Sequence, residues 1–192
     1  MKNNRLYAAC FLLVMLSLLL SSCAVSRGNS AFLRPSVDIN YIKKVAVLPF
    51  GGNGKDVLAA TRARDITITQ LLARHIFDVV DKGLVDSVLQ EEAIEPGTPL
   101  DKAMIKRIGQ RLNVQALVLG TVDQADIVRH GMFSYPEISI TLRLVDVKSG
   151  LILWQATGHA SGYSFLGRLF GLQPESEYQV TFRAINNLLS TL

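Results

Sequence analysis

Cys23 is the residue of this sequence whose surroundings prepare it most clearly for a specific chemical modification. Lys2 and Arg5 give the chain a basic start, and an almost unbroken apolar run of 15 residues extends from Leu6 to Leu20. Two serines then lead into the cysteine. A basic start, an apolar core and small residues at the exit are the three parts of a secretory signal. The run is shorter than the ~20 residues that a membrane-spanning helix needs.

The sequence Leu20-Ser21-Ser22-Cys23 resembles the lipobox of bacterial lipoprotein precursors. The resemblance implies that the Cys23 thiol receives a diacylglyceryl group and that cleavage just before it leaves Cys23 as the acylated N-terminus. Two or three acyl chains anchor a protein firmly, whereas a single chain gives only marginal binding. In this family Ala24, in place of an aspartate, favours the outer membrane. The alternatives are an ordinary signal peptide and an uncleaved anchor in which the cysteine is incidental.

Other residue patterns point away from catalysis. The Gly51–Asp56 segment has the setting of a phosphate loop, but Pro49 stands where the first glycine is needed and Asp56 where a hydroxyl is needed. We therefore interpret it as a flexible turn. The three histidines are far apart in the sequence and belong to no spaced metal-ligand motif. No nucleophile elbow is present. We expect no enzyme activity, no cofactor and no metal.

A second candidate site is the glycine-rich segment over residues 162–173. Its apolar side chains fall outside the expected helices and strands, and a contiguous apolar patch commonly marks a contact with a partner or a membrane. The alternative is a loop packed under the C-terminal helix. The candidate contact residues are Tyr163, Phe165, Leu166, Arg168, Leu169 and Phe170, with Arg168 available to lipid phosphate or an acidic partner.

Charge and cysteine content restrict the possible partners. The precursor has 20 basic and 16 acidic residues, and removing residues 1–22 takes away two of the basic ones. The remaining excess of about +2 is small and dispersed, so we expect no nucleic-acid surface. The sequence contains only Cys10 and Cys23. After processing and acylation there is no disulfide and no thiolate metal site.

The chain divides into three parts: a lipoprotein signal peptide at 1–22, a lipidated N-terminus and tether at 23–40, and one domain at 41–192. Short apolar runs predict buried strands at 45–50, 77–80 and 116–122, separated by helical patterns at 57–75, 84–89 and 98–112. Asp81 and Thr98 are suitable helix caps. Alternation at 138–144 and the apolar run at 151–156 predict an antiparallel hairpin, and a final helix covers 178–189. The expected fold class is α/β, a three-layer-like domain with parallel strands joined by helices, an added antiparallel hairpin and a C-terminal helix.

The order of these segments resembles a known superfamily. The resemblance lies in Lys43–Phe50, Phe77–Lys82, Leu112–Val122 and Leu142–Gly150, followed by Trp154. These segments look like the periplasmic domain of the curli secretion channel lipoprotein (CsgG) superfamily. They are also similar to the lipoprotein activator of a penicillin-binding protein (LpoB). The matching positions are mostly core positions, so they speak for the fold more than for an activity.

The resemblance implies a non-catalytic, outer-membrane-anchored periplasmic domain that binds other envelope proteins as a secretion or assembly accessory, and that could assemble with copies of itself. The alternatives are a subunit of an oligomeric outer-membrane secretion channel and an LpoB-like activator of a cell-wall synthase. Channel-forming members carry two long insertions that become transmembrane hairpins. Here residues 123–137 are too few for such a hairpin, which needs about twenty residues and a turn. Residues 158–177 have little alternation, so the sequence favours the accessory.

Overall fold

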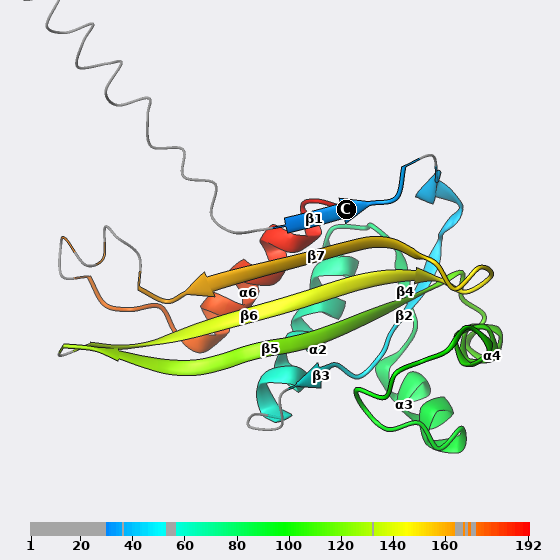
Figure 1. Cartoon of the computed structure of the whole chain (residues 1–192), viewed down its shortest axis with the longest axis horizontal. Helices are drawn as coiled ribbons and strands as arrows, with labels where there is room; N and C mark the ends of the chain where they lie inside the picture. Colours follow the sequence, from blue (N-terminus) through cyan, green and yellow to red (C-terminus); the bar gives the residue numbers. More distant parts are fainter. Residues whose placement is uncertain are drawn as a thin grey trace, which may run out of the picture.

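The computed structural model of the chain describes residues 30–35, 37–52, 57–131, 133–163, 167, 169 and 172–192. Within these residues the chain forms a seven-stranded sheet flanked by helices (Figure 1). In chain order the elements are β1 (Ser30–Leu33), the 3-10 helix η1 (Ile39–Tyr41), β2 (Lys44–Val47), β3 (Gly51–Gly52), α2 (Val57–Ala73), β4 (Asp78–Val79), α3 (Lys82–Glu91), α4 (Lys102–Leu112), β5 (Ala116–His130), β6 (Phe133–Asp146), β7 (Ile152–Ser161) and α6 (Glu177–Leu189).

The sheet joins a parallel half to an antiparallel half. Its strand order is β1-β7-β6-β5-β2-β4, and β3 also pairs with β5. Strand β2 lies parallel to both β4 and β5, whereas β5, β6, β7 and β1 pair antiparallel in succession. Parallel neighbours need long crossover connections, and α2 and the α3–α4 pair supply them. The α/β fold class, with its antiparallel hairpin and C-terminal helix, is confirmed.

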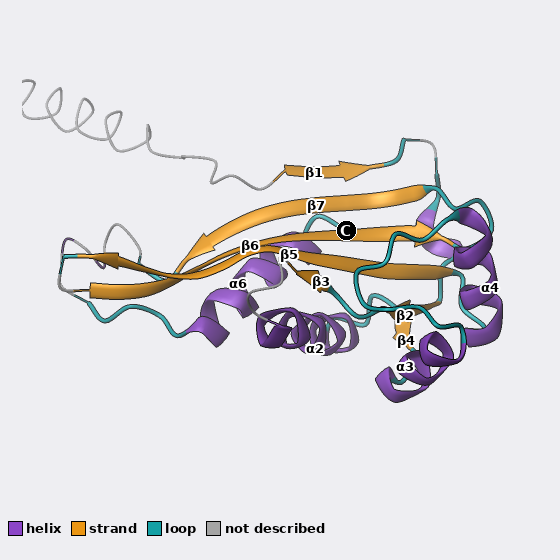
Figure 2. Ribbon diagram, turned by 60° about the horizontal axis from the view of Figure 1, so that its bottom comes forward, coloured by secondary structure: helices purple, strands orange, loops and turns teal. Residues whose placement is uncertain are grey.

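The helices cover the two faces of the sheet unequally. Helices α2 and α6 lie along one face and enclose the larger core, in which Trp154 and Ile185 are buried (Figure 2). Helices α3 and α4 lie at the β2–β4 end and form a smaller core on the opposite face, around Leu117 and Ile108. Beyond that corner, no helix among the described residues covers the second face of β5, β6 and β7 (Figure 2).

Helix ends follow local capping chemistry. Asp81 accepts hydrogen bonds from the Gly83 and Leu84 amides, which confirms its predicted role as a cap. Thr98 was expected to cap the next helix, but the N-cap of α4 lies three residues later. Asp101 takes the role because its carboxylate accepts a 2.8 Å hydrogen bond from the Met104 amide.

The start of the described chain differs from the expected tether. Residues Ser30–Leu33 form β1, which pairs antiparallel with Trp154–Thr157 of β7. All four residues of β1 are exposed, so the strand is held through its backbone and leaves no hydrophobic pattern in the sequence. The part of the tether before this strand is therefore only Ala24 to Asn29.

The β5–β6 hairpin is longer than the sequence predicts. The expected strands end at residue 122 and begin again at residue 138, whereas β5 continues to His130 and β6 begins at Phe133. A bulge between Val122 and Gln124 shifts the register, and pairing then continues to His130 opposite Phe133. The bulge interrupts the alternation that would identify one continuous strand. Residues 123–137 thus include a hairpin extension where the sequence suggested only a short insertion.

Candidate functional site

The candidate site lies where the β5–β6 hairpin and the segment after β7 meet. Figures 1 and 2 both show the tip of this hairpin extending past the helices, with the segment that follows β7 lying at the same end of the molecule. The two are joined directly, because the Gly162 amide donates a 2.7 Å hydrogen bond to the Pro136 carbonyl. A methyl group at Gly162 would lie 2.8 Å from the Pro136 ring, so this approach requires a glycine.

Three aromatic rings make up the interior of this end. The ring of Tyr163 lies 5.2 Å from that of Phe133 and 5.4 Å from that of Tyr135, measured between centroids. Tyr163 is 6% exposed and Tyr135 is 4% exposed. Tyr163 was predicted as a contact residue, but the structure places its ring in a packed cluster. It supports the surface rather than forming it, and Phe133 is held against it.

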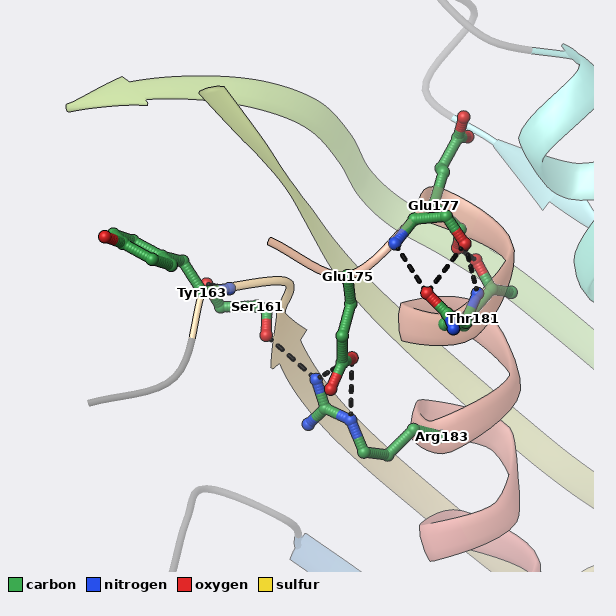
Figure 3. A network of polar contacts seen from close by, with 8 residues as sticks. Ser161, Tyr163, Glu175, Glu177, Thr181 and Arg183 are labelled. Atoms are coloured by element: carbon green, nitrogen blue, oxygen red, sulfur yellow. Dashed lines mark hydrogen bonds and ion pairs between the residues drawn. The ribbon is translucent and has the colours of Figure 1, made fainter. Parts of the chain in front are cut away.

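Arg183 of α6 closes the segment that contains the candidate residues. Its Nη2 atom donates hydrogen bonds of 2.9 Å to the Ser161 carbonyl and 2.7 Å to the Glu175 carboxylate (Figure 3). The Glu175 amide in turn donates a 2.8 Å bond to the Gly162 carbonyl. The two ends of the segment are therefore fastened to one another and to α6. The alternative in the sequence analysis was a loop packed under the C-terminal helix. Ser161 and Glu175, at the two ends of the segment, do contact that helix through Arg183.

Exposed apolar side chains gather at the same end. Ile127 is 61% exposed, Phe133 39%, Leu169 65% and Leu172 57%. We call these four residues the apolar end. Four predicted contact residues lie outside the described residues: Phe165, Leu166, Arg168 and Phe170. Of the predicted contacts that are described, Leu169 is exposed and Tyr163 is buried. Ile127 and Phe133 were missed because the sequence showed no continuous strand there.

Cys23 also lies outside the described residues, and Ser30, seven residues later, is the first described residue after it. Strand β1 runs antiparallel to β7, and Ser30 pairs with Thr157, four residues before β7 ends at Ser161. The start of β1 is therefore the end of that strand nearer to the apolar end. Figures 1 and 2 both show the start of β1 pointing toward this side.

The uncovered face of the sheet is polar and ends in a cleft. Thr141 donates a 2.8 Å hydrogen bond to Asp123 and lies 3.0 Å from the Thr157 hydroxyl, and Ser139 lies 3.1 Å from Nδ1 of His159. The cleft, of about 670 Å³, lies beside α3 and α4. Arg143 is its half-buried cation, among residues that include Leu48, Leu89, Glu95, Leu119 and Ile152.

A buried carboxylate joins the segment just before β2 to the turn after β6 by hydrogen bonds. Tyr41 donates a 2.9 Å hydrogen bond to Asp146, which also accepts from the Ser149 amide at 2.7 Å. Burial raises the pKa of the Asp146 carboxyl, but hydrogen bonds from Ser149, Tyr41 and the Lys148 backbone outweigh burial and lower that pKa. Burial and the adjacent carboxylate raise the pKa of Tyr41 to about 12. This pair has a structural role.

The described residues offer no cluster of three or more histidine, cysteine, aspartate or glutamate side chains that is placed to hold a metal ion. The structure places the histidines at separate sites: His75 follows α2, His130 ends β5 and His159 lies on β7. Within the described part of the chain, no helix combines the length and apolarity needed to cross a membrane.

Comparison with known proteins gives a fold and no sequence family. No protein-family model matches the chain, and no curated protein matches it. Among solved structures, the PelC dodecamer from Paraburkholderia phytofirmans aligns with a TM-score of 0.58 and 20% identity over 85% of this chain and 94% of that chain. Lipoprotein GNA1162 from Neisseria meningitidis aligns with a TM-score of 0.54 and 18% identity over 68% of this chain and 92% of that chain.

The C-terminal domain of LpoB from Salmonella enterica is also among the structural neighbours, with a TM-score of 0.44 and 16% identity over 74% of this chain and 90% of that chain. That score is too low to support an argument. The PelC and GNA1162 alignments are at low identity and concern the fold alone. At the level of the fold alone, they confirm the CsgG-like resemblance that the core segments suggested.

Proposed function

We propose that this protein is a bacterial envelope lipoprotein, anchored through acyl chains on Cys23, whose folded domain binds other envelope proteins without catalysing a reaction. Its role would be that of an accessory in secretion or assembly. The observation that carries the proposal is the lipobox-like Leu20–Cys23 sequence placed a few residues before a domain with this fold.

The structural neighbours support both parts of this proposal. One of them is described as a lipoprotein, GNA1162, and another as a dodecamer, PelC. A domain that shares their fold and follows a lipobox-like sequence is well suited to an anchored binding role. By analogy with the PelC dodecamer, we include copies of this chain among its partners. We place it at the outer membrane, facing the periplasm, because Ala24 follows Cys23.

The apolar end supports contact with another surface as the mode of action. Its exposed residues are large and apolar, whereas the polar groups beside it serve to close the segment between Ser161 and Glu175. Rigidly presented apolar side chains are suited to docking on another surface. The described clusters of polar residues act as caps, turns and strand-to-strand bonds, which are structural roles.

Fractionation of cells tests the anchor. The leader is replaced by an ordinary cleavable secretion signal and Cys23→Ala is introduced, so that the domain is exported without a lipid. We expect this domain in the soluble periplasmic fraction, and the natural chain in the outer-membrane fraction. Cys10→Ala in the natural chain is the matched control and should stay with the membrane. Tight membrane binding of the exported Cys23→Ala domain would contradict the acyl chains on Cys23 as the anchor.

Crosslinking in living cells followed by mass spectrometry tests the binding role. We expect crosslinks from the domain to a small set of envelope proteins, or to other copies of the chain. Purified domain that converts a substrate, or a chain with no reproducible partner, would contradict this role.

A further inference from the structure

The tether is short compared with the distance to which the β5–β6 hairpin projects. Seven residue steps separate Cys23 from Ser30, and a fully extended chain covers at most ~25 Å over that length. Acyl chains on Cys23 therefore hold Ser30 within that distance of the membrane surface. This step rests on the proposed acylation of Cys23, and the rest of the inference rests on the described residues.

The tip of the β5–β6 hairpin lies beyond Ser30 by a distance similar to the full length of this tether. Ser30 pairs with Thr157, which pairs with Thr141, and Phe133 lies eight residues from Thr141 on β6. At the rise of an antiparallel strand, the tip is about 27 Å beyond the row of Ser30. Ser30, the first residue of β1, lies at the end of that strand nearer to the hairpin tip. If the domain is held by Cys23 and its strands stand perpendicular to the membrane, its hairpin tip therefore reaches the membrane surface.

The chemistry of this end suits a lipid surface. Ile127, Phe133, Leu169 and Leu172 are exposed, and the Tyr163 and Tyr135 rings hold Phe133 in place. The opposing arrangement, with the sheet lying flat, would press the polar row of Ser139, Thr141, Thr157 and His159 against lipid, which is unfavourable for polar groups.

The depth of contact is limited by charge. Asp126 and Glu137 face each other across the hairpin and mark the last acidic row before the tip. From that row the strands continue only as Ile127–His130 and Phe133–Pro136, about 13 Å. This is less than half of the ~30 Å hydrocarbon core. The end of the hairpin can therefore enter the interfacial region but not span the bilayer.

We propose that the apolar end is a second, interfacial contact with the membrane, which makes the lipid anchor and the hairpin tip a two-point attachment that sets the domain upright. The tip segment carries Arg129 against Asp126 and Glu137, so its attraction to the membrane is apolar. It does not depend on anionic lipid, and salt does not weaken it.

The test uses a polarity-sensitive dye on the intact, acylated protein in vesicles. Cys10 is removed with the leader and the Cys23 thiol is occupied by lipid, so an introduced cysteine is the only available thiol. Arg129→Cys places the dye at the tip. Lys148→Cys, an exposed cation in the turn at the opposite end of β6, is the matched control. Vesicles are made of phosphatidylcholine alone and of phosphatidylcholine with phosphatidylglycerol.

We expect the dye at residue 129 to shift to the blue and to be quenched by spin-labelled lipid in both vesicle types and at high salt. The dye at residue 148 should keep the emission of a dye in water and should not be quenched by spin-labelled lipid. Adding Ile127→Ser and Leu172→Ser should return the dye at residue 129 to water while the protein stays on the vesicles. A dye at residue 129 that reports water, a dye at residue 148 that reports lipid, or a signal that requires anionic lipid would overturn the proposal.

The intact mass of the same sample separates the two proposals. Acylated protein whose tip remains in water overturns the second contact and leaves the lipid anchor standing. Protein found on membranes without acyl groups on Cys23 overturns the proposed anchor and, with it, the constraint on which this inference rests.

Discussion

At the scale of single residues, Asp146 connects two distant parts of the chain. Its carboxylate accepts hydrogen bonds from Tyr41, just before β2, and from Ser149 in the turn after β6. Asp146 is 6% exposed, so these bonds are made away from most of the solvent. The sequence reveals this residue only as part of a turn, because its partner at position 41 is more than a hundred residues away.

Asp146→Asn should lower the free energy of unfolding at pH 7 by about 1–3 kcal/mol, because an amide cannot accept the same set of hydrogen bonds. The folded-state pKa of Asp146 is lowered from its usual 3.8. Its contribution is therefore complete above that value and is lost as the pH falls through the folded-state pKa. Urea unfolding at pH 7 and pH 3 should show the difference between the variant and wild type shrinking in acid.

Asp126→Asn is the control for this experiment, because Asp126 is exposed near the hairpin tip. It should change the stability at pH 7 little. A difference between Asp146→Asn and wild type that stays constant between pH 7 and pH 3 would show that its carboxylate is not the source of the stabilisation.

Gly109 shows how closely α4 packs on the turn that follows β6. A methyl group built at Gly109 would lie 2.3 Å from a methyl carbon of Val147. Gly109→Ala should therefore lower the free energy of unfolding by about 1–3 kcal/mol, since overpacking outweighs the ~1 kcal/mol gained in helix propensity. Urea unfolding measures the change.

The double variant Gly109→Ala with Val147→Ala tests the cause. Shortening Val147 makes room for the new methyl group, so the two changes together should cost less than their separate costs added. Additive costs would show that this contact does not explain the effect.

At the scale of elements, β2, β4, the start of β5 and the helices of the parallel half could be predicted because each is an apolar run or a helical repeat. Strand β3 was missed, because its two glycines were interpreted as part of a turn but pair with β5. The C-terminal helix was predicted for the same reason, and α6 buries Ile185 and Leu188. Strand β1 could not be predicted, because its residues are exposed and it is held by the backbone of β7. The far part of the β5–β6 hairpin was missed because a bulge shifts its alternation.

The candidate site was predicted in part for related reasons. The glycine-rich segment identified a region of apolar surface, and Leu169 is exposed as expected. The burial of Tyr163 against Phe133 and Tyr135 depends on a hairpin that the sequence did not show. The two ends of the segment are joined by Arg183, a residue of α6 whose role follows only from the folded arrangement.

Arg183→Ala should loosen the segment between Ser161 and Glu175 without unfolding the domain. The Arg183–Glu175 pair is partly exposed, so its loss should lower the free energy of unfolding by about 1 kcal/mol or less. The larger effect should be local, with proteolytic cleavage between Tyr163 and Leu172 faster than in wild type. Limited proteolysis with mass analysis of the fragments measures it.

Arg62→Ala is the matched control, because Arg62 also forms a partly exposed ion pair with α6, at Glu177, but does not contact Ser161 or Glu175. It should leave the cleavage rate in the segment unchanged. Equal cleavage of Arg183→Ala and wild type would mean that Arg183 does not close the segment.

At the scale of the whole molecule, the described residues form one sheet whose two ends differ in character. One end carries α3, α4 and the cleft beside Arg143, and the other carries the exposed apolar residues, whereas β1 begins part-way along the sheet, opposite Thr157 of β7. Under the proposed anchoring at Cys23, the apolar end would face the membrane and the opposite end would face the periplasm.

The most direct test of this account is the intact mass of the mature protein purified from the membranes of the bacterium that makes it. We predict a chain that begins at Cys23 and carries two or three acyl chains there, with residues 1–22 removed. A membrane-bound chain that retains residues 1–22, or one that begins elsewhere with Cys23 unmodified or absent, would contradict the account.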